Sequence, residues 1–300
     1  MIKARAWLSA MRLRTLPLSI SGIITGSAMA YNYGAFKWSI CILALLTTLG
    51  FQIVSNFAND YGDGIKGTDN DERIGPARAM QSGLLSEKEL RNGIIFTAIL
   101  TILISLGLIY NAFGQENFTL SIVFFLLGVS AVFAAVKYTI GDSAYGYKGL
   151  GDVFVFLFFG VVAVVGSYFL YTREIFFKVF LPAITIGLLS VAVLNLNNMR
   201  DRITDGKVNK NTLAVILGEK GSKMYHAFLI SLSFAAALFY FVITDLWQWS
   251  GISLLVFIPL FIHLKRVFNY DSPALLDPEL KVVALLTFAF SILFTTGMLF

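Results

Sequence analysis

The chain has 300 residues, of which 57% are hydrophobic and only 14% are charged, and its formal net charge is +5. Soluble domains carry roughly 25% charged residues, so this composition excludes an ordinary soluble protein and predicts one embedded in a lipid bilayer. The positive net charge does not indicate a nucleic acid partner, because the lysines and arginines stand at the ends of long apolar segments.

Nine apolar segments are each about 20 residues long, the length that an α-helix needs to cross a bilayer. They predict an all-α, polytopic membrane bundle of about nine transmembrane helices, organised as a single integral membrane domain over residues 1–300. The expected spans are residues 15–33, 38–60, 88–111, 118–137, 150–171, 178–199, 222–244, 248–268 and 280–299. No signal peptide is expected, because the basic N-terminus runs into a full-length span without a small-residue cleavage site.

Short local patterns mark where some of these helices begin or bend. Residues 86–89 form a capping box that opens the third span. Asp277 and Pro278 provide a cap and a first-turn proline for the ninth span. Pro182 and Pro259 are expected to kink the sixth and eighth spans rather than to end them.

The loops on the two sides of the spans differ strongly in charge. Of the 23 lysines and arginines, 20 fall on the side that carries the N-terminus, and only Lys37, Arg173 and Lys178 fall on the other. Because basic loops stay in the cytoplasm, we expect a protein of the cytoplasmic (inner) membrane whose N-terminus faces the cytoplasm. The longest loops, residues 61–87 and 200–221, lie on the same side, so a site formed by them would be cytoplasmic.

The second span ends in a polar motif that provides the first candidate site. Asn56, Asn59, Asp60 and Asp63 stand three or four residues apart, so a helix would place their side chains on one broad face. Carboxylates next to a membrane span are costly unless they are paired, solvated or bound to a cation. Three glycines that follow are expected to break the helix and release the chain into a loop: Gly62, Gly64 and Gly67.

The sixth span ends in a similar motif, in which Asn198, Asp201 and Asp205 again share one helix face. For one pair of carboxylates, simple solvation explains the pattern as well as ligand binding does. Two pairs, each preceded by asparagines within an apolar run, favour a site, because buried amides need hydrogen-bond partners. Carboxylates from two helix ends could hold magnesium, which takes one or two carboxylates together with water and substrate phosphate.

Basic residues on the same side could bind an anion next to these carboxylates. Arg78 offers a planar donor fork that suits the oxygens of a diphosphate. Weaker candidates for the same role are Lys66, Lys137, Arg200 and Lys210. Each of these residues, taken singly, is better explained by the charge asymmetry that sets membrane topology.

A stretch rich in tyrosine and glycine precedes the fifth span. Tyr138 and Tyr147 offer aromatic rings to an electron-poor carbon, and Asp152 offers a base or a partner for another site residue; the alternative is a flexible connector. The stretch is not a dinucleotide fingerprint, because no strand precedes it. His226 and His263 are isolated and lack the spacing of a zinc site, so we expect packing roles for both.

Together these stretches resemble the UbiA superfamily of membrane prenyltransferases. Asn59-Asp60-x-x-Asp63, with Asp69 six residues further on, is similar to its first aspartate motif, and Asn198-x-x-Asp201-x-x-x-Asp205 to its second. Within the superfamily, three stretches are most similar to the branch that acts on 1,4-dihydroxy-2-naphthoate: residues 12–17, 75–80 and 197–201. Residues 147–152 fit its fifth helix, and residues 210–215 fit the loop after its second motif. The spacing of Asp69 differs from that of ubiquinone-type relatives, and Asn209 stands where relatives often have glycine.

The resemblance implies nine helices around a central cavity that opens laterally to lipid. It implies an enzyme of menaquinone biosynthesis that transfers a polyprenyl chain from polyprenyl diphosphate to 1,4-dihydroxy-2-naphthoate, with loss of carbon dioxide and diphosphate. Two magnesium ions would be held at the catalytic centre, one by Asp60 and Asp63 and one by Asp201 and Asp205. The asparagines of both motifs would complete or orient these sites: Asn56, Asn59 and Asn198.

Three other functions stay open on the sequence alone. The acceptor could be another aromatic ring, such as 4-hydroxybenzoate or homogentisate. A secondary transporter could use the acids to bind a coupling ion, but transporter sites usually lie near the bilayer midplane on broken helices, whereas these acids stand at helix ends. A structural scaffold would leave both acidic pairs unexplained. Prenyl chain length and oligomeric state do not follow from the sequence.

Overall fold

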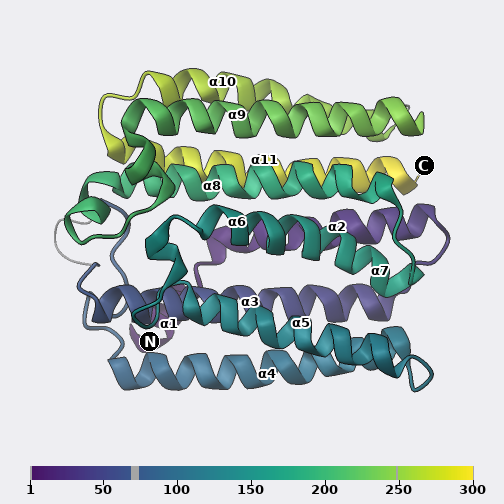
Figure 1. The fold of residues 1–300 in the computed structure, drawn as a ribbon, viewed down its shortest axis with the longest axis horizontal. Helices are drawn as coiled ribbons and strands as arrows, with labels where there is room; N and C mark the ends of the chain where they lie inside the picture. The colour runs from purple at the N-terminus through teal and green to yellow at the C-terminus, as the bar shows by residue number, and fades with distance from the viewer. Residues whose placement is uncertain (1, 69–73, 248, 300) are drawn as a thin grey trace.

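The structure, a computed structural model, describes residues 2–68, 74–247 and 249–299, so the motif residue Asp69 lies outside the described residues. The described residues form helices and short connections, with no β-strand among them (Figure 1). The α-helices are α1 (Ile2–Met11), α2 (Leu16–Asn32), α3 (Trp38–Ile65), α4 (Glu87–Phe113), α5 (Phe118–Lys137), α6 (Gly151–Val155), α7 (Ser167–Thr172), α8 (Phe180–Lys207), α9 (Leu213–Thr244), α10 (Phe257–Phe268) and α11 (Leu276–Leu299). The 3₁₀ helices are η1 (Leu13–Thr15), η2 (Tyr145–Lys148), η4 (Phe177–Val179), η5 (Ser250–Val256) and η6 (Pro273–Leu275), and η3 (Phe156–Gly166) is a π-helix.

The long helices run side by side as one bundle (Figure 1). Among the described residues, eight helical stretches are long and apolar enough to cross a membrane. The ninth expected span, α2, has 17 residues, which at 1.5 Å per residue gives about 26 Å against a hydrocarbon core of about 30 Å. The predicted all-α membrane bundle is therefore confirmed, with eight full-length spans in the described chain rather than nine.

Helix α8 forms the centre of the bundle and carries the second acidic motif. In its most apolar part 83% of the residues are buried, against 11–39% in the other spans. It packs against α9, α11 and η3. The approach to η3 is close at Gly160, where an added methyl group would lie 2.6 Å from the carbonyl oxygen of Ala183. Helix α8 is thus held by helices on several sides.

A second, smaller core cluster fixes the loop that precedes α4. Phe57 of α3 packs there with Ala79 and Leu85 of the loop, all three being almost fully buried. Trp7 of α1 meets Phe57 edge-on, with ring centroids 5.1 Å apart. The cluster therefore holds the described part of the loop around Ala79 and Leu85, and with it the neighbouring Arg78, against the end of α3.

Two expected helix starts have different outcomes. The capping box is confirmed, because the Ser86 hydroxyl accepts from the backbone N–H of Glu89 while the Glu89 carboxylate accepts from the backbone N–H of Ser86. The cap expected at Asp277 is wrong. This residue lies inside α11, which begins at Leu276, and its carboxylate pairs with Arg200 of α8.

The structure also corrects the expected helix breaks. Helix α3 continues through Gly62 and Gly64, because these glycines allow close packing rather than a turn. A methyl group on Gly62 would lie 2.5 Å from the hydroxyl oxygen of Thr139. Pro182 and Pro259, at which kinks are expected, stand near the starts of α8 and α10. Each is the third residue of its α-helix, where the backbone N–H needs no partner within the helix.

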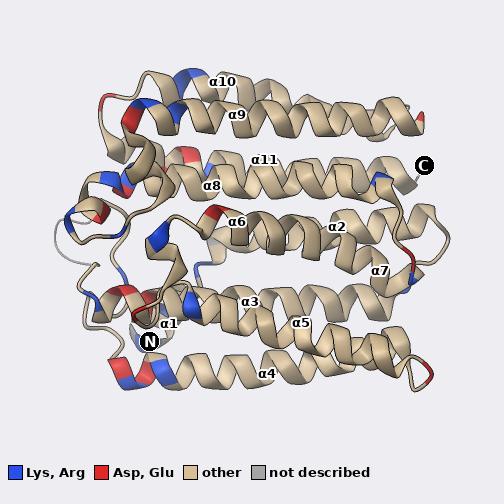
Figure 2. Ribbon diagram, in the orientation of Figure 1, with Lys and Arg blue, Asp and Glu red and all other residues tan. Residues whose placement is uncertain are grey.

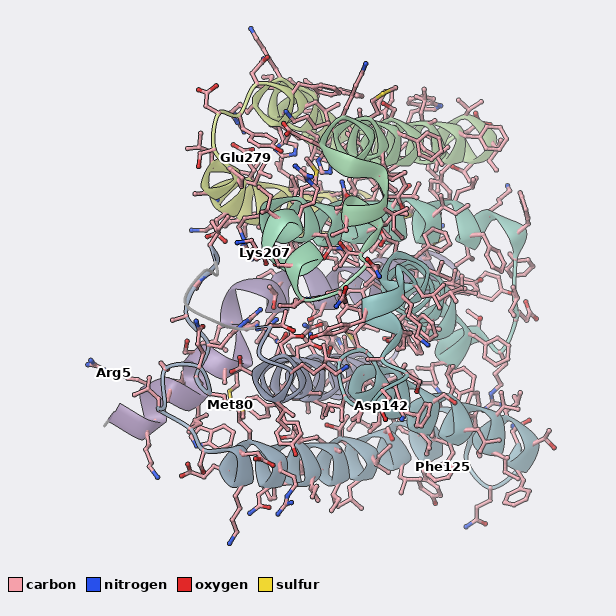
Figure 3. All side chains as sticks on the ribbon, turned by 60° about the vertical axis from the view of Figure 1, so that its left-hand side comes forward. Arg5, Met80, Phe125, Asp142, Lys207 and Glu279 are labelled. Carbon is pink, nitrogen blue, oxygen red and sulfur yellow. The ribbon has the colours of Figure 1, made fainter. Side chains whose placement is uncertain are left out.

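Charged residues gather at one end of the bundle, which we call the basic end (Figure 2). It is formed by the last turns of α3, α5, α8 and α10 and by the first turns of α4, α9 and α11. Figure 3 turns this end forward, with Arg5, Met80, Lys207 and Glu279 on it and Phe125 of α5 farther along the bundle. Both acidic motifs lie in last turns at this end, so the topology brings them to the same side as the sequence predicts.

Candidate active site

A cavity of about 370 Å³ runs through the bundle from the basic end. Along α3 its lining extends from Asp63 to Ala44, a helical distance of about 28 Å at 1.5 Å per residue. Its charged and amide side chains are Arg12, Gln52, Asn56, Asn59, Asp63, Arg78, Asn197, Asn198, Asp201 and Lys210. Its large apolar side chains include Phe51, Leu108, Phe124, Leu127, Phe158, Val162 and Leu170. The cavity thus joins a charged mouth to a long apolar interior.

In the first acidic motif, the loop before α4 docks onto Asp60. The Asp60 side chain is 1% exposed, and its Oδ1 lies 3.7 Å from Nε of Arg78. Its Oδ2 accepts a hydrogen bond of 3.2 Å from the backbone N–H of Ala79. Because Ala79 is anchored in the smaller core cluster, the position of Arg78 at the cavity is fixed by packing.

The second carboxylate of this motif, Asp63, is held by the tyrosine-rich connector. The Tyr147 hydroxyl donates to Asp63 Oδ1 at 2.7 Å and also lies 2.6 Å from the hydroxyl of Thr68. Burial, followed by the charge of Asp63, raises the pKa of Tyr147, so the phenol stays protonated and remains a donor at neutral pH. Asp63 therefore keeps a fixed orientation at the cavity wall.

In the second acidic motif, the two carboxylates have different partners. Asp201 receives two hydrogen bonds from its neighbour Arg200, from Nε at 2.8 Å and from Nη2 at 2.7 Å. Asp205 lies one turn further on and has Lys210 Nζ 3.5 Å from its Oδ1. Asp201 and Asp205 are both almost fully buried, which a carboxylate tolerates only when cations or donors surround it.

Lys210 joins the two motifs. Its ammonium lies 3.8 Å from Asp63 Oδ2 and 3.5 Å from Asp205 Oδ1, and 5.4 Å from the centre of the Tyr147 ring. Burial alone would lower the pKa of Lys210, but the charges of Asp63 and Asp205 outweigh burial and raise the pKa above its ordinary value. A permanent positive charge therefore stands between the last turns of α3 and α8.

The asparagines of the first motif have structural partners as well as cavity contacts. Asn56 accepts from the Gln52 amide at 3.2 Å and donates to the carbonyl oxygen of Met11 at 2.9 Å. This bond ties the end of α1 to the cavity. Asn59 lies 3.5 Å from the Thr139 hydroxyl, which also donates to the carbonyl oxygen of Ala58.

The structure brings some of the predicted site residues to the cavity and places others behind it. Those that line the cavity are Asn56, Asn59, Asp63, Arg78, Tyr138, Asn198, Asp201 and Lys210. The lining does not include Asp60, Lys66, Lys137, Tyr147, Asp152, Arg200 or Asp205. Within this second group, four residues contact a lining residue directly: Asp60, Tyr147, Arg200 and Asp205.

The three remaining predicted residues lie farther from the cavity. Lys66 is exposed, donates to the carbonyl oxygen of Gly141 at 2.9 Å and lies over the Tyr147 ring. Lys137 is the last residue of α5. Asp152 is buried in the first turn of α6. Within the described part of the chain, no hydrogen bond or ion pair joins these three residues to Asp60, Asp63, Asp201 or Asp205, although the charge of Asp63 acts on Lys66.

Three charged or amide side chains that line the cavity lie outside the predicted site: Arg12, Gln52 and Asn197. Gln52 stands one helical turn before Asn56, so helical spacing could have added it to the first motif. Arg12 lies in a left-handed turn between α1 and η1, with φ of 51°. The residues around Arg12 do not indicate that this turn lies at the cavity, because its position depends on how α1 packs against distant parts of the chain.

The acidic motifs suit a divalent cation by their donor chemistry. Among the described residues, no three His, Cys, Asp or Glu side chains converge as a ready-made metal site. Magnesium does not require one, because it takes one or two carboxylates and completes its shell with water and phosphate. In the described part of the chain, Asp60 Oδ1 and Asp205 Oδ2 are buried without a hydrogen-bond partner. Buried anionic oxygens of this kind fit a hard cation.

The sequence matches the model of the UbiA prenyltransferase family over residues 19–275. The chain is 42% identical over 300 residues to the 1,4-dihydroxy-2-naphthoate octaprenyltransferase of Haemophilus influenzae, with 99% of this chain and 96% of that protein covered. It is 40% identical over 282 residues to the enzyme of the same name from Escherichia coli, with 93% and 90% covered.

Two solved structures share the fold at low sequence identity. A UbiA homologue from Aeropyrum pernix superimposes with a TM-score of 0.68 at 13% identity, covering 96% of this chain and 98% of that one. A UbiA homologue from Archaeoglobus fulgidus, bound to DMAPP and Mg²⁺, gives a TM-score of 0.62 at 17% identity, covering 97% and 99%. The match over residues 19–275 and the two curated relatives show that this chain belongs to the UbiA prenyltransferase family.

Proposed function

We propose that this protein transfers a polyprenyl chain from polyprenyl diphosphate to 1,4-dihydroxy-2-naphthoate, forming demethylmenaquinol for menaquinone biosynthesis. Two relatives at 42% and 40% identity, each covered over at least nine-tenths of its length, are named for this acceptor. The observation that carries the proposal is the cavity, whose charged mouth suits a diphosphate and whose apolar interior suits an isoprenoid chain. Membership of a transferase family also favours an enzyme over a transporter.

The residues at the mouth support a position for the diphosphate. Arg78 and Lys210 both line the cavity and both contact carboxylates of the acidic motifs. An arginine fork and a lysine ammonium are the side chains that proteins use to bind phosphate oxygens. The diphosphate therefore lies between the last turns of α3 and α8, and the prenyl chain extends past Phe51 and Phe158 toward the other side of the bundle.

Four carboxylates would hold the divalent cation: Asp60 and Asp63 on α3, and Asp201 and Asp205 on α8. We propose two magnesium ions, one for each motif, as the pairing of the aspartates suggests. Magnesium bound there would neutralise the charge that develops on the diphosphate as it leaves. Asn56, Asn59 and Asn198 orient the carboxylates or complete the oxygen shell.

The reaction balances without a protein base. The bond between the allylic carbon and the diphosphate oxygen breaks, and diphosphate leaves with the electron pair. The ring carbon that bears the carboxylate forms the new carbon–carbon bond, and carbon dioxide then departs and returns its electron pair to the ring. Burial raises the pKa values of Tyr138 and Tyr145, so both cavity phenols stay neutral and serve to exclude water and face the allylic cation.

The acceptor can be tested with 1,4-dihydroxy-2-naphthoate that carries carbon-13 in its carboxyl group. Purified protein with Mg²⁺ and polyprenyl diphosphate is expected to release labelled carbon dioxide and prenylated naphthalene diol in equal amounts, measured by mass spectrometry. The matched acceptor 4-hydroxybenzoate is expected to give no product. A prenylated product that keeps the label, or preferential use of 4-hydroxybenzoate, would contradict the acceptor and leave the prenyltransferase class intact.

We further propose that the basic end faces the cytoplasm of a cell with an inner membrane, as the distribution of lysine and arginine indicates. In a Cys41→Ser background, cysteines at the exposed positions Lys207 and Asp142 are expected to react with a membrane-impermeant maleimide only in inverted vesicles. A cysteine at the exposed position Gln115, at the opposite end, is expected to react only in intact spheroplasts. The reverse labelling pattern would contradict the orientation.

A further inference from the structure

The first turn of α11 reaches the second acidic motif through one buried cation. Asp277 accepts a hydrogen bond of 2.5 Å from Nη1 of Arg200. The other two nitrogens of the same guanidinium bind both oxygens of Asp201, at 2.8 and 2.7 Å. Arg200 is 1% exposed, and Asp201 lines the cavity. Asp277, Arg200 and Asp201 therefore form a continuous chain from the C-terminal helix to the cavity wall.

The charges of this chain decide what Asp201 presents to the cavity. Arg200 and Asp201 alone would carry no net charge, and a carboxylate held in a bidentate pair with arginine is a weak ligand for a cation. With Asp277 the three residues carry one net negative charge. Asp277 also holds the third nitrogen of the guanidinium, so the fork cannot rotate away from Asp201. Asn197 adds a further acceptor, at 3.0 Å from Nη2.

We propose that Asp277 is a positioning residue for Asp201, acting through Arg200, and that it sets the affinity of the second acidic motif for a divalent cation. The inference rests on the proposed function in its assignment of a cation to Asp201. Asp277 is not among the residues that line the cavity, and Arg200 is the residue that connects it to Asp201. Residues that orient metal ligands from behind typically change metal affinity by about 10–100-fold.

The same turn of α11 offers a matched control in Glu279. Its carboxylate accepts from Arg266 Nε at 2.6 Å and pairs with Nδ1 of His263. His263 in turn contacts His226, with Nε2 atoms 2.9 Å apart, so the two histidines are not isolated as their sequence positions suggested. These contacts tie α11 to α9 and α10. None of the four residues lines the cavity, so Glu279→Gln disturbs the same turn without touching Arg200.

The test measures binding of Mn²⁺ to the purified full chain by electron paramagnetic resonance, without substrate. Mn²⁺ is used because it occupies the oxygen sites that magnesium prefers. Asp277→Asn keeps the shape of the side chain and removes its charge, and it is expected to raise the Mn²⁺ Kd about tenfold. Glu279→Gln is expected to leave the Kd unchanged. In turnover, Asp277→Asn should raise the Mg²⁺ concentration for half-maximal rate by a similar factor, with little change in kcat at saturating Mg²⁺.

A double-mutant cycle shows whether Asp277 acts through Arg200. In an Arg200→Gln background, the further change Asp277→Asn is expected to alter the Mn²⁺ Kd by less than about twofold, because the connecting cation is gone. A tenfold effect in that background, or equal effects of Asp277→Asn and Glu279→Gln on Kd, would overturn the inference. If the single variant Asp277→Asn does not fold, the Mn²⁺ Kd of Arg200→Gln is compared with that of the double variant Arg200→Gln/Asp277→Asn. A tenfold difference between these two Kd values would overturn the inference.

A separate variant distinguishes failure of this inference from failure of the metal assignment. Asp201→Ala is expected to weaken Mn²⁺ binding more than Asp277→Asn does, because it removes the ligand itself. Wild-type Mn²⁺ binding in Asp201→Ala would refute Asp201 as a ligand and, with it, this part of the proposed function. Weakened binding in Asp201→Ala together with wild-type binding in Asp277→Asn would refute the inference alone.

Discussion

Alanine at Asp63 or Asp201 is expected to lower the rate of prenyl transfer by at least about a hundredfold, the scale of losing one strong electrostatic stabiliser of the transition state. Both carboxylates line the cavity; Asp63 lies 3.8 Å from Lys210, and Asp201 is held by Arg200. Asp60→Ala and Asp205→Ala are expected to have comparable effects. The measurement is initial rate with saturating polyprenyl diphosphate, over a range of Mg²⁺ concentrations.

An exposed acid at the same end provides the control for these variants. Asp142 lies in the loop after α5, is exposed and does not line the cavity. Asp142→Ala is therefore expected to retain wild-type activity. Each variant should elute as folded protein of wild-type size, so that loss of rate reports on the site. Near-wild-type activity in any two of the four motif variants would refute the two-metal arrangement.

The span pattern and both acidic motifs could be read from the sequence because they depend on local periodicity. A run of about 20 apolar residues defines a span, and carboxylates three or four residues apart share a helix face wherever the helix lies. The capping box at Ser86 and Glu89 follows the same logic, since both partners lie within one turn. These features need no knowledge of how the helices pack.

The parts that sequence reasoning missed depend on contacts between distant segments. Arg12 reaches the cavity because α1 folds onto α3, and Asp277 reaches Arg200 because α11 packs against α8. Gly62 is a residue type that favours turns, yet the chain stays helical there, and the absence of a side chain lets Thr139 pack against it. Asp277 likewise has the sequence pattern of a helix cap, but in the structure it lies inside α11 and pairs with the buried Arg200 of α8.

The number of spans and the type of each helix are harder to predict from the sequence than the positions of the spans. Helix α2 and the fifth predicted span illustrate the difficulty. α2 has the composition of a span but only 17 residues. The fifth predicted span becomes a short α-helix, a π-helix and a second short α-helix. A π-helix is rare and often occurs at functional sites. Here Phe158, Phe159 and Val162 of η3 line the cavity, a placement that hydropathy alone cannot specify.

The second large effect is expected at Lys210, whose ammonium lies between Asp63 and Asp205. Lys210→Met keeps the length of the side chain and removes its charge, leaving two buried carboxylates without their shared cation. Breaking a buried ion pair by removing one partner costs about 3–5 kcal/mol. In the presence of EDTA the variant is therefore expected to unfold at a clearly lower temperature than the wild type, measured by the intrinsic fluorescence of detergent-solubilised protein.

Magnesium should then distinguish an electrostatic role from simple packing. A divalent cation can replace the lost charge between the two motifs, so Mg²⁺ is expected to stabilise Lys210→Met more than the wild type. Lys66→Met is the matched control, because Lys66 also lies over the Tyr147 ring, at 4.1 Å from its centre, but is exposed and donates to the carbonyl oxygen of Gly141 instead of bridging the two carboxylate pairs. Equal destabilisation of the two variants, or no extra stabilisation of Lys210→Met by Mg²⁺, would show that the ammonium does not hold the acidic motifs together.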